Sequence, residues 1–266
     1  MKKSMAYGVR QPAVAGMFYP ADKQELLLMM KNFFQKTKKI ISEEKKIKAL
    51  IVPHAGYLYS GQTAAWGYNQ LPEKLANNHF VLIGLSHHFA FDGLCVSRVD
   101  YWQTPLGRVK HLSIFQVEKN IFASDRPHLQ EHCLEVQLPL LQFLYKKFLI
   151  SCLLTGQRLD YQKIADWLLK HYSKSIFIIS SDLSHYLPAS QAEKKDKKTI
   201  EAVLNFDRSY FLNEENTACG MMGILILLEL AKKLKWKKKI IYYDSSATAS
   251  GDNQAVVGYA SIGFYV

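Results

Sequence analysis

Three short apolar segments that each stop abruptly at polar residues constrain the fold of this chain most strongly. The stretch "ALIVPH" ends at His54, "HFVLIGLSHH" delivers His87 and its neighbour, and "SIFIISSD" ends at Asp182. Short apolar runs with β-branched residues predict buried strands. Helical periodicity lies between such runs, for example over residues 23–36 and 160–171. Strands that alternate with helices predict a sheet covered by helices on both faces.

The other segments extend this pattern. "FLISCLLTG" predicts another buried strand, residues 93–112 predict a hairpin, and the closing "KIIYYDSSA" and "AVVGYASIGFYV" are strand-like. Residues 131–147 have a helical period that Pro139 interrupts. No repeat or Pro/Gly/Ser-rich linker divides the chain. We therefore expect one three-layer α/β domain over residues 1–266, with a mostly parallel or mixed central sheet.

Composition excludes several classes of protein. A hydrophobic fraction of 48% and a charged fraction of 21% are ordinary for a globular protein. The longest apolar run, residues 223–228, is far shorter than the roughly 20 residues that cross a bilayer. Arg10, Gln11 and Asp22 interrupt any signal-peptide pattern. The four cysteines form no CxxC pair. We expect a cytoplasmic protein without a membrane partner.

The formal net charge of +11 raises the question of nucleic-acid binding. The lysines cluster in "KTKKIISEEKKIK", "EKKDKK" and "KKLKWKKK", which have the character of solvated helix ends and loops. They accompany no RNP-type aromatic motif, helix-turn-helix pattern or zinc-finger spacing. We expect no nucleic-acid partner and a basic surface that favours acidic partners.

The polar strand ends predict a metal site. Ligands of open α/β sheets bind at the carboxyl ends of the strands, so parallel strands would bring His54, His87 and the pair Asp182/His185 to one edge. Imidazole suits iron, copper and zinc, and two histidines usually need an anionic ligand beside them. The candidate anionic ligands are Asp182, Glu131, Glu135 and Cys219.

Cys219 stands just before the apolar helical stretch "GMMGILILLEL". A helix N-terminus favours the thiolate, which makes a cysteine there a candidate ligand or nucleophile. A free cysteine is equally often a small buried hydrophobe, and spacing alone does not decide between these readings. The three remaining cysteines lie in apolar patterns and are predicted to be core residues: Cys95, Cys133 and Cys152.

The segment "LQEHCLEVQLP" places Glu131 and Glu135 on one helix face, with His132 about a quarter turn away. A carboxylate on such a face could orient a ligand histidine. The alternative is a solvated acidic stripe on an amphipathic helix. The remaining histidines stand at element edges near lysines or prolines and are predicted to be surface residues: His79, His111, His128 and His171.

Taken together, "AVAGMFYP", "VPHAGYLYSG", "GLSHH", "EHCLEVQLP", "SSDLSHY" and "ACG" resemble the motifs of the Memo family, also called AmmeMemoRadiSam system protein B. The motifs stand in the family's order and cover nearly the whole chain. The resemblance implies the LigB-like α/β fold of class III extradiol dioxygenases, which bind non-haem Fe(II) through two histidines and a glutamate.

Carried over by motif, the resemblance implies that His54, His87 and Cys219 are the metal ligands. Asp182 and His185 would line the pocket, and with Cys219 they are the catalytic candidates. In "GLSHH", Leu85 stands where relatives often have proline. The implied second-shell or pocket residues are His88, Tyr57, Glu131 and His132.

The implied cofactor is iron or copper, since a soft thiolate also favours copper. A thiolate in place of the glutamate argues against ordinary ring cleavage. We therefore expect a metal-dependent redox enzyme, with Asp182 or His185 as acid/base group, that acts on an unknown small molecule or peptide. The alternative is a non-catalytic metal- or peptide-binding module on a dioxygenase-derived fold. The family name also implies AMMECR-like and radical-SAM partners.

Overall fold

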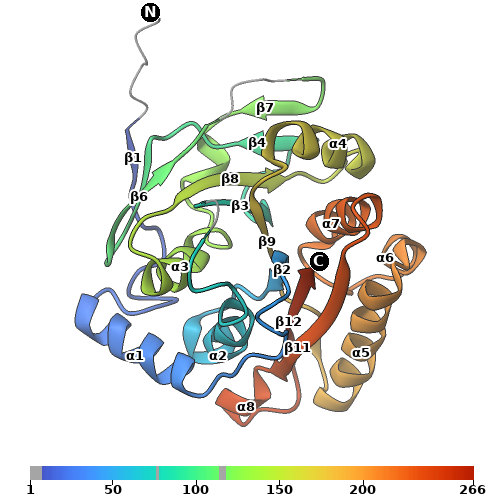
Figure 1. Ribbon diagram of the computed structural model, residues 1–266. Helices are drawn as coiled ribbons and strands as arrows, with labels where there is room; N and C mark the ends of the chain where they lie inside the picture. The colour runs from blue at the N-terminus through green and yellow to red at the C-terminus, as the bar shows by residue number, and fades with distance from the viewer. Residues whose placement is uncertain (1–7, 76–77, 114–117) are drawn as a thin grey trace, which may run out of the picture.

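The computed structural model describes residues 8–75, 78–113 and 118–266 of the chain (Figure 1). Four parallel strands form its centre, in the order β8, β3, β9 and β2. Their bounds are Leu149–Thr155, His79–Leu85, Ile176–Ser180 and Ile47–Val52. The apolar runs of the sequence therefore form one continuous parallel core, as predicted.

Strands on both sides of this core make the sheet mixed. The strand β12 (Val256–Tyr265) pairs antiparallel with β2, and both β11 (Lys237–Ser245) and β10 (His185–Leu187) pair antiparallel with β12. The strand β6 (Gly107–His111) runs parallel to β8 and forms the predicted hairpin with β5 (Tyr101–Thr104). The remaining short strands are β1 (Val9–Arg10), β4 (Leu94–Val96) and β7 (Ile121–Ala123).

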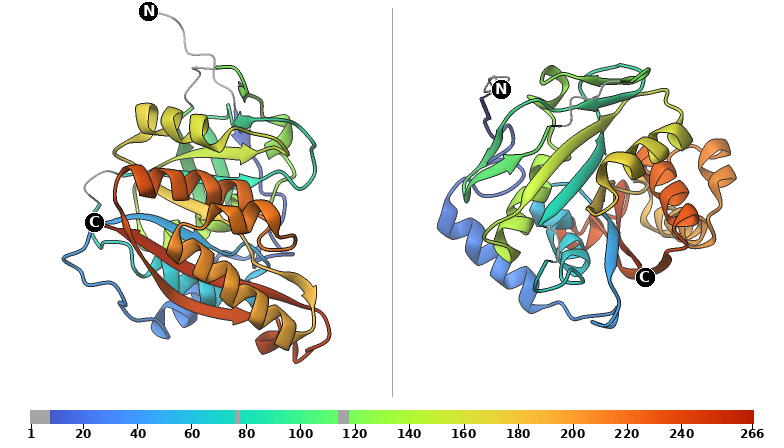
Figure 2. Two further views of the ribbon diagram at one scale, coloured as in Figure 1. Left: turned by 90° about the vertical axis from the view of Figure 1, so that its right-hand side faces the viewer. Right: turned by 45° about the horizontal axis from the view of Figure 1, so that its top comes forward.

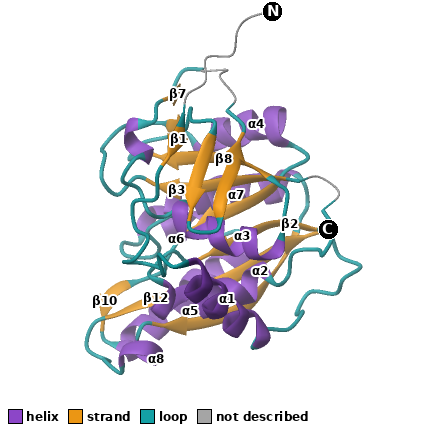
Figure 3. Ribbon diagram, turned by 90° about the vertical axis from the view of Figure 1, so that its left-hand side faces the viewer, coloured by secondary structure: helices purple, strands orange, loops and turns teal. Residues whose placement is uncertain are grey.

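Helices cover both faces of the sheet. One face carries α4 (Tyr161–Tyr172), α5 (Ala189–Asn205), α6 (Arg208–Asn213) and α7 (Met221–Lys233), which lie on the near side in the left view of Figure 2. The other carries α1 (Lys23–Gln35), α2 (Tyr57–Tyr68) and α3 (Leu138–Leu144), with α1 in front in Figure 3. Beside β11 lies the short helix α8 (Ala247–Ser250).

Two apolar clusters hold these three layers together. Along β2, Ala49 and Ile51 belong to one cluster, while Leu50 and Val52 belong to the other. Successive side chains of a strand point to opposite faces, so a strand that is apolar at every position packs against both helical layers. This explains why the strands read as unbroken apolar runs.

The predicted helix over residues 131–147 is wrong in its first part. Helical structure begins with the 3₁₀ turn Glu135–Gln137 and continues as α3, with Pro139 in the first turn, where its missing N–H costs nothing. The carboxylate of Glu131 accepts hydrogen bonds from the backbone N–H groups of His132 and Cys133. These local bonds compete with helical ones and hold the segment in an irregular path.

The prediction of surface positions is wrong for His79, His111 and His128, each of which is at most 8% exposed. His79 lies between the hydroxyls of Ser151 and Ser175, and Nε2 of His111 accepts the backbone N–H of Cys152. Burial lowers the pKa of His79 to about 4 and that of His111 and His128 to about 3, so these imidazoles are neutral.

Within the described ranges, every helix is too short or too polar to span a bilayer.

Candidate metal centre

The carboxyl ends of three neighbouring strands gather the candidate residues at one edge of the sheet. His54 lies two residues beyond β2, His87 two beyond β3, and Asp182 two beyond β9. The strands run parallel in the order β3, β9, β2, with Val52 beside Ser180 in the ladder. The expected convergence of the strand ends is therefore observed.

Three imidazoles form the centre of this edge. The ligand atoms that His54, His87 and His132 offer all lie within 4.8 Å of one another. The ring centroids are 5.3 Å apart for His54 and His87, 4.5 Å for His87 and His132, and 5.4 Å for His54 and His132. His54 is buried, His132 half-buried and His87 partly exposed, so the group sits at the floor of an accessible hollow.

Cys219 joins this group from the far end of the chain. Its Sγ lies 3.2 Å from Nε2 of His54. The backbone N–H of Asp182 donates to the sulfur, and the N–H of Cys219 donates to the carbonyl of Asp182, both at 3.2 Å. A Cβ on Gly220 would stand 2.6 Å from that of Ser181, so a glycine permits this close approach of the α7 N-terminus to the β9 end.

Hydrogen bonds fix the tautomers of the two ligand candidates. The Nδ1 of His87 lies 2.8 Å from a carboxylate oxygen of Glu131, which only accepts, so Nδ1 carries the proton. The Nδ1 of His54 lies 3.0 Å from Oγ of Ser180, whose hydroxyl donates to the carbonyl of Cys133 and therefore accepts from His54. In both rings Nε2 is therefore left unprotonated, the form that metal-binding histidines require, and Nε2 of His54 accepts a hydrogen bond from the thiol of Cys219.

Glu131 anchors this side of the group. It is fully buried and accepts the backbone N–H of His87 at 2.7 Å as well as its ring proton. Burial raises the pKa of the carboxyl, but the hydrogen bonds and charge of His87 outweigh it and hold the pKa well below the usual range. Nδ1 of His132 lies 3.3 Å from the same carboxylate. Glu131 thus orients two imidazoles at once.

Burial controls the protonation of the remaining groups. It lowers the pKa of His54 to about 3 and of His132 to about 4, with neighbouring imidazole charge as the next cause in each. These rings are therefore neutral, the form that binds metals. Burial, and then the charge of Asp182, raises the pKa of the Cys219 thiol. A metal bound there would have to displace the thiol proton.

Asp182 contacts His54, whereas His185 is held by Leu183 and Asn216. An oxygen of Asp182 accepts the backbone N–H of His54 at 2.7 Å, and its other oxygen lies 4.0 Å from Nε2 of the same ring. His185 begins β10, and its Nδ1 donates to the carbonyl of Leu183 at 2.8 Å. This bond leaves Nε2 of His185 unprotonated in the neutral ring.

Two other candidates lie outside the group. The hydroxyl of Tyr57 donates to the carbonyl of Val136, and its buried ring packs on Tyr19 and Phe33. Glu135 is buried too, but its partners are Arg10, Tyr19 and two backbone N–H groups. The structure thus separates Glu135 from Glu131, although both stand on the same predicted helix face.

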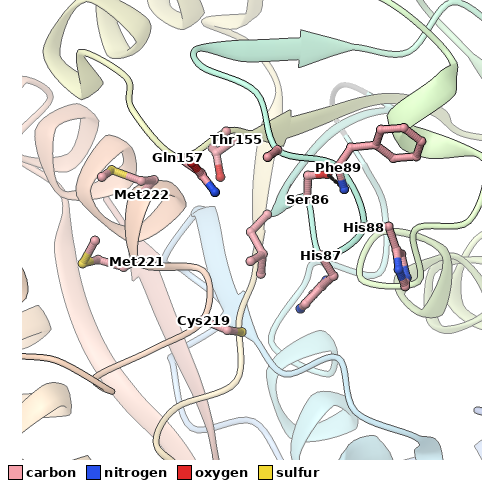
Figure 4. A pocket seen from close by; sticks show the side chains of 12 residues that line it. Ser86, His87, His88, Phe89, Thr155, Gln157, Cys219, Met221 and Met222 are labelled. Carbon is pink, nitrogen blue, oxygen red and sulfur yellow. Dashed lines mark hydrogen bonds between the residues drawn. The ribbon is translucent and has the colours of Figure 1, made fainter.

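A cavity of about 420 Å³ opens beside His87 and Cys219. Figure 4 shows the tip of the His87 ring pointing across it towards the sulfur. None of the side chains that line it is an aspartate, glutamate, lysine or arginine. Besides the histidines His87 and His88 and the thiol, its polar lining residues are Ser86, Thr155 and Gln157, and its large apolar ones are Leu85, Phe89, Met221 and Met222.

Sequence reasoning missed several of these residues. Thr155 is the last residue of β8, inside the predicted strand "FLISCLLTG", and Gln157 follows that stretch. A search for polar residues at the end of this strand, as at the other three, would have found both. Ser180 stands in the polar strand end "SSDLSHY" but was not singled out there, and Gln137 gave no such signal. Nε2 of Gln137 donates to Oγ of Ser180 and to the carbonyl of Pro53, and so supports the hydroxyl that orients His54.

The fold and the site define an α/β protein that carries a histidine–cysteine cluster in a pocket at the carboxyl edge of parallel strands. A family model described as Memo-like protein matches residues 10–263. MEMO1 family protein Ta0237 of Thermoplasma acidophilum is 36% identical, covering 95% of this chain and 97% of the relative. A MEMO1 family protein of Aquifex aeolicus is 37% identical, with 96% and 99% covered. The chain belongs to the Memo family.

Among solved structures, the crystal structure of uncharacterized protein JW3007 from Escherichia coli K12 matches 82% of this chain and 99% of its own. The TM-score is 0.44 at 13% sequence identity, a likeness too weak to carry an argument.

Proposed function

We propose that this chain binds one iron or copper ion and uses it in a redox reaction on a small molecule. The proposed ligands are Nε2 of His54, Nε2 of His87 and Sγ of Cys219. One observation carries the proposal: Nδ1 hydrogen bonds hold both imidazoles with Nε2 unprotonated, and the Cys219 sulfur lies 3.2 Å from Nε2 of His54. Ordinary core histidines have no need of this arrangement.

The donor set fits either metal. Imidazole suits iron, copper and zinc, and a thiolate supplies the anionic, soft ligand that two neutral histidines lack. The group of donors that holds both His54 and His87 within 4.8 Å of one another contains His132 rather than Cys219, so His132 competes for the third position. A test of the site therefore has to include both residues.

The protein's own groups would divide the remaining work. A bound iron or copper ion supplies one-electron chemistry and polarises a ligand oxygen. Asp182 and His185 are the proposed acid/base groups, with Nε2 of His185 as the atom that holds the proton. The uncharged lining of the cavity favours a substrate without strong charge, with polar atoms towards Thr155 and Gln157 and apolar ones towards the methionines.

The first test is metal content by mass spectrometry after anaerobic purification. We expect near-stoichiometric iron or copper in the wild type and its loss in His87→Ala and Cys219→Ala. If His132→Ala lost its metal and Cys219→Ala kept it, the third ligand would be His132 and not Cys219. His88→Ala, an exposed neighbour on the rim, is the matched control and should keep its metal. A wild type that stays metal-free even after reconstitution would overturn the proposal.

A second measurement separates the enzyme from a binding module. His185→Ala should keep its metal and lose O₂-dependent turnover, because its ring lies outside the ligand group. Full turnover in this variant would refute the acid/base role. A non-catalytic module would instead show metal without any O₂-dependent spectral change, and it would keep peptide affinity in a His54→Ala/His87→Ala double variant.

A further inference from the structure

A second hollow, here called the basic groove, lies at the other end of the parallel strands. It has a volume of about 680 Å³ and is bordered by α1, the β5–β6 hairpin and the connection from α3 to β8. Leu149, the first residue of β8, lines it, whereas Thr155, the last, lines the metal pocket. Seven residues of strand span about 20 Å, so the two hollows are separate sites.

The groove concentrates positive charge. Among the residues that the structure describes, no acidic side chain lines it. The two acidic residues nearest in sequence on the α1 side, Asp22 and Glu25, line a different hollow. Like charges gathered in a concave surface repel one another and focus the potential, and an anionic ligand relieves this repulsion. The cationic lining residues are Lys23, Arg108, Lys110, Lys146 and Lys147.

These cations have no carboxylate partner. Among the described residues, no ion pair joins any of the four lysines to a carboxylate, and Arg108 donates to the amide oxygen of Gln103. All five side chains are exposed. Among the described residues, exposed lysines elsewhere also lack ion pairs, as Lys194, Lys197 and Lys198 of α5 do. The groove is therefore distinguished by the gathering of five cations around one hollow, and not by the lack of ion pairs.

The rings in the groove argue against single-stranded nucleic acid. Binding of that kind needs aromatic faces on which bases stack. The rings of Tyr145 and Phe148 both pack on Phe80, with centroids 5.8 Å away, and the Tyr145 hydroxyl donates to the carbonyl of Pro72. Tyr101 is the exposed ring that remains, and one ring makes a poor stacking platform.

The spread of the cations argues against a compact phosphate. They come from three separate stretches of the chain, and all five are exposed, so none forms a buried clamp. Between them lie half-buried apolar side chains, Leu27 and Leu106. An extended chain that alternates carboxylates with apolar side chains matches this pattern of cations around an apolar floor.

We propose that the basic groove binds an acidic segment of a partner protein in extended form. Its carboxylates contact Arg108 and the lysines, and its apolar side chains pack on Leu27 and Leu106. The inference does not depend on the metal centre, because the two sites share no residue.

The test uses the full chain and a fluorescein-labelled peptide in which glutamates alternate with leucine and phenylalanine, followed by fluorescence anisotropy. The triple variant Arg108→Glu/Lys110→Glu/Lys147→Glu should weaken binding by at least about tenfold. The control Lys194→Glu/Lys197→Glu/Lys198→Glu makes the same change of net charge on exposed positions of α5 and should stay within about twofold of wild type. A Lys110→Gln/Lys147→Gln variant tests the same groove without charge reversal.

Three results would overturn the proposal. Equal losses in both triple variants would show that net charge alone drives binding. If a single-stranded oligonucleotide or phosphatidylserine vesicles bound more tightly than the peptide and were weakened equally by the groove variant, the partner would be a nucleic acid or a membrane and not an acidic peptide. If peptide binding were unchanged in every groove variant, the peptide would bind elsewhere on the protein.

Discussion

Replacement of Glu135 by glutamine should cost this protein several kcal/mol of stability. The carboxylate is fully buried and accepts hydrogen bonds from Arg10, from the hydroxyl of Tyr19 and from the backbone N–H groups of Ala13 and Val14. Arg10 is itself only 2% exposed, and its guanidinium lies over the ring of Trp102. Glutamine keeps the volume but leaves the guanidinium buried without a counter-charge.

The expected loss follows from this geometry. Removal of one partner of a buried ion pair costs about 3–5 kcal/mol, because the remaining charge stays desolvated. In a chain of this size that corresponds to a fall of roughly 10 °C in Tm. Since Arg10 also donates to the backbone carbonyls of His128 and Glu131, the loss should loosen the segment that carries the metal-site residues.

Urea unfolding monitored by circular dichroism measures the loss. The control Glu118→Gln removes an exposed ion pair with Lys170 and should cost below about 1 kcal/mol. The double variant Arg10→Met/Glu135→Leu should lose less than the sum of its single variants, because it removes both buried charges. A Glu135→Gln variant no less stable than Glu118→Gln would refute the reasoning.

Three further predictions follow from other parts of the structure. Glu131→Gln should weaken metal binding about 10- to 100-fold in chelator competition, since the amide holds His87 less firmly, and an unchanged affinity would contradict this. Gly84→Ala would place a Cβ 2.4 Å from Sγ of Cys133, and a loss of about 1–3 kcal/mol should appear in urea unfolding; a stable variant would show that the core yields there. Because burial lowers the pKa of His111 and His128 to about 3 from 6.5, the unfolded chain alone takes up protons between these values. The free energy of unfolding should therefore fall as pH drops from 6.5, by about 1.4 kcal/mol per pH unit for each imidazole. A His128→Gln variant whose stability depends on pH as steeply as that of the wild type would show that His128 does not contribute.

Local pattern was sufficient to predict the parallel core and the edge where the site lies. Unbroken apolar runs require burial on both faces of the sheet. Parallel strands bring their carboxyl ends together, so His54, His87 and Asp182 could be placed at one edge from the sequence alone. The caps of α1 and α4 are equally local features, since Asp22 and Asp160 accept N–H groups two or three residues away.

The same pattern could not separate Glu131 from Glu135. Both have the spacing of one helix face, yet the structure pairs the first with His87 and the second with Arg10, because the chain between them is not an α-helix. Nor could it predict that His132 joins the imidazole group or that His79, His111 and His128 are buried.

The amino-acid sequence by itself determined which segments are buried and which strand ends are polar, because both depend on neighbours a few residues apart. Only the tertiary structure decided which polar groups meet: Arg10 and Glu135 are 125 positions apart, and His54 and Cys219 are 165. A buried polar side chain must find a partner wherever packing brings one close, and that choice depends on the arrangement of whole layers rather than on local periodicity.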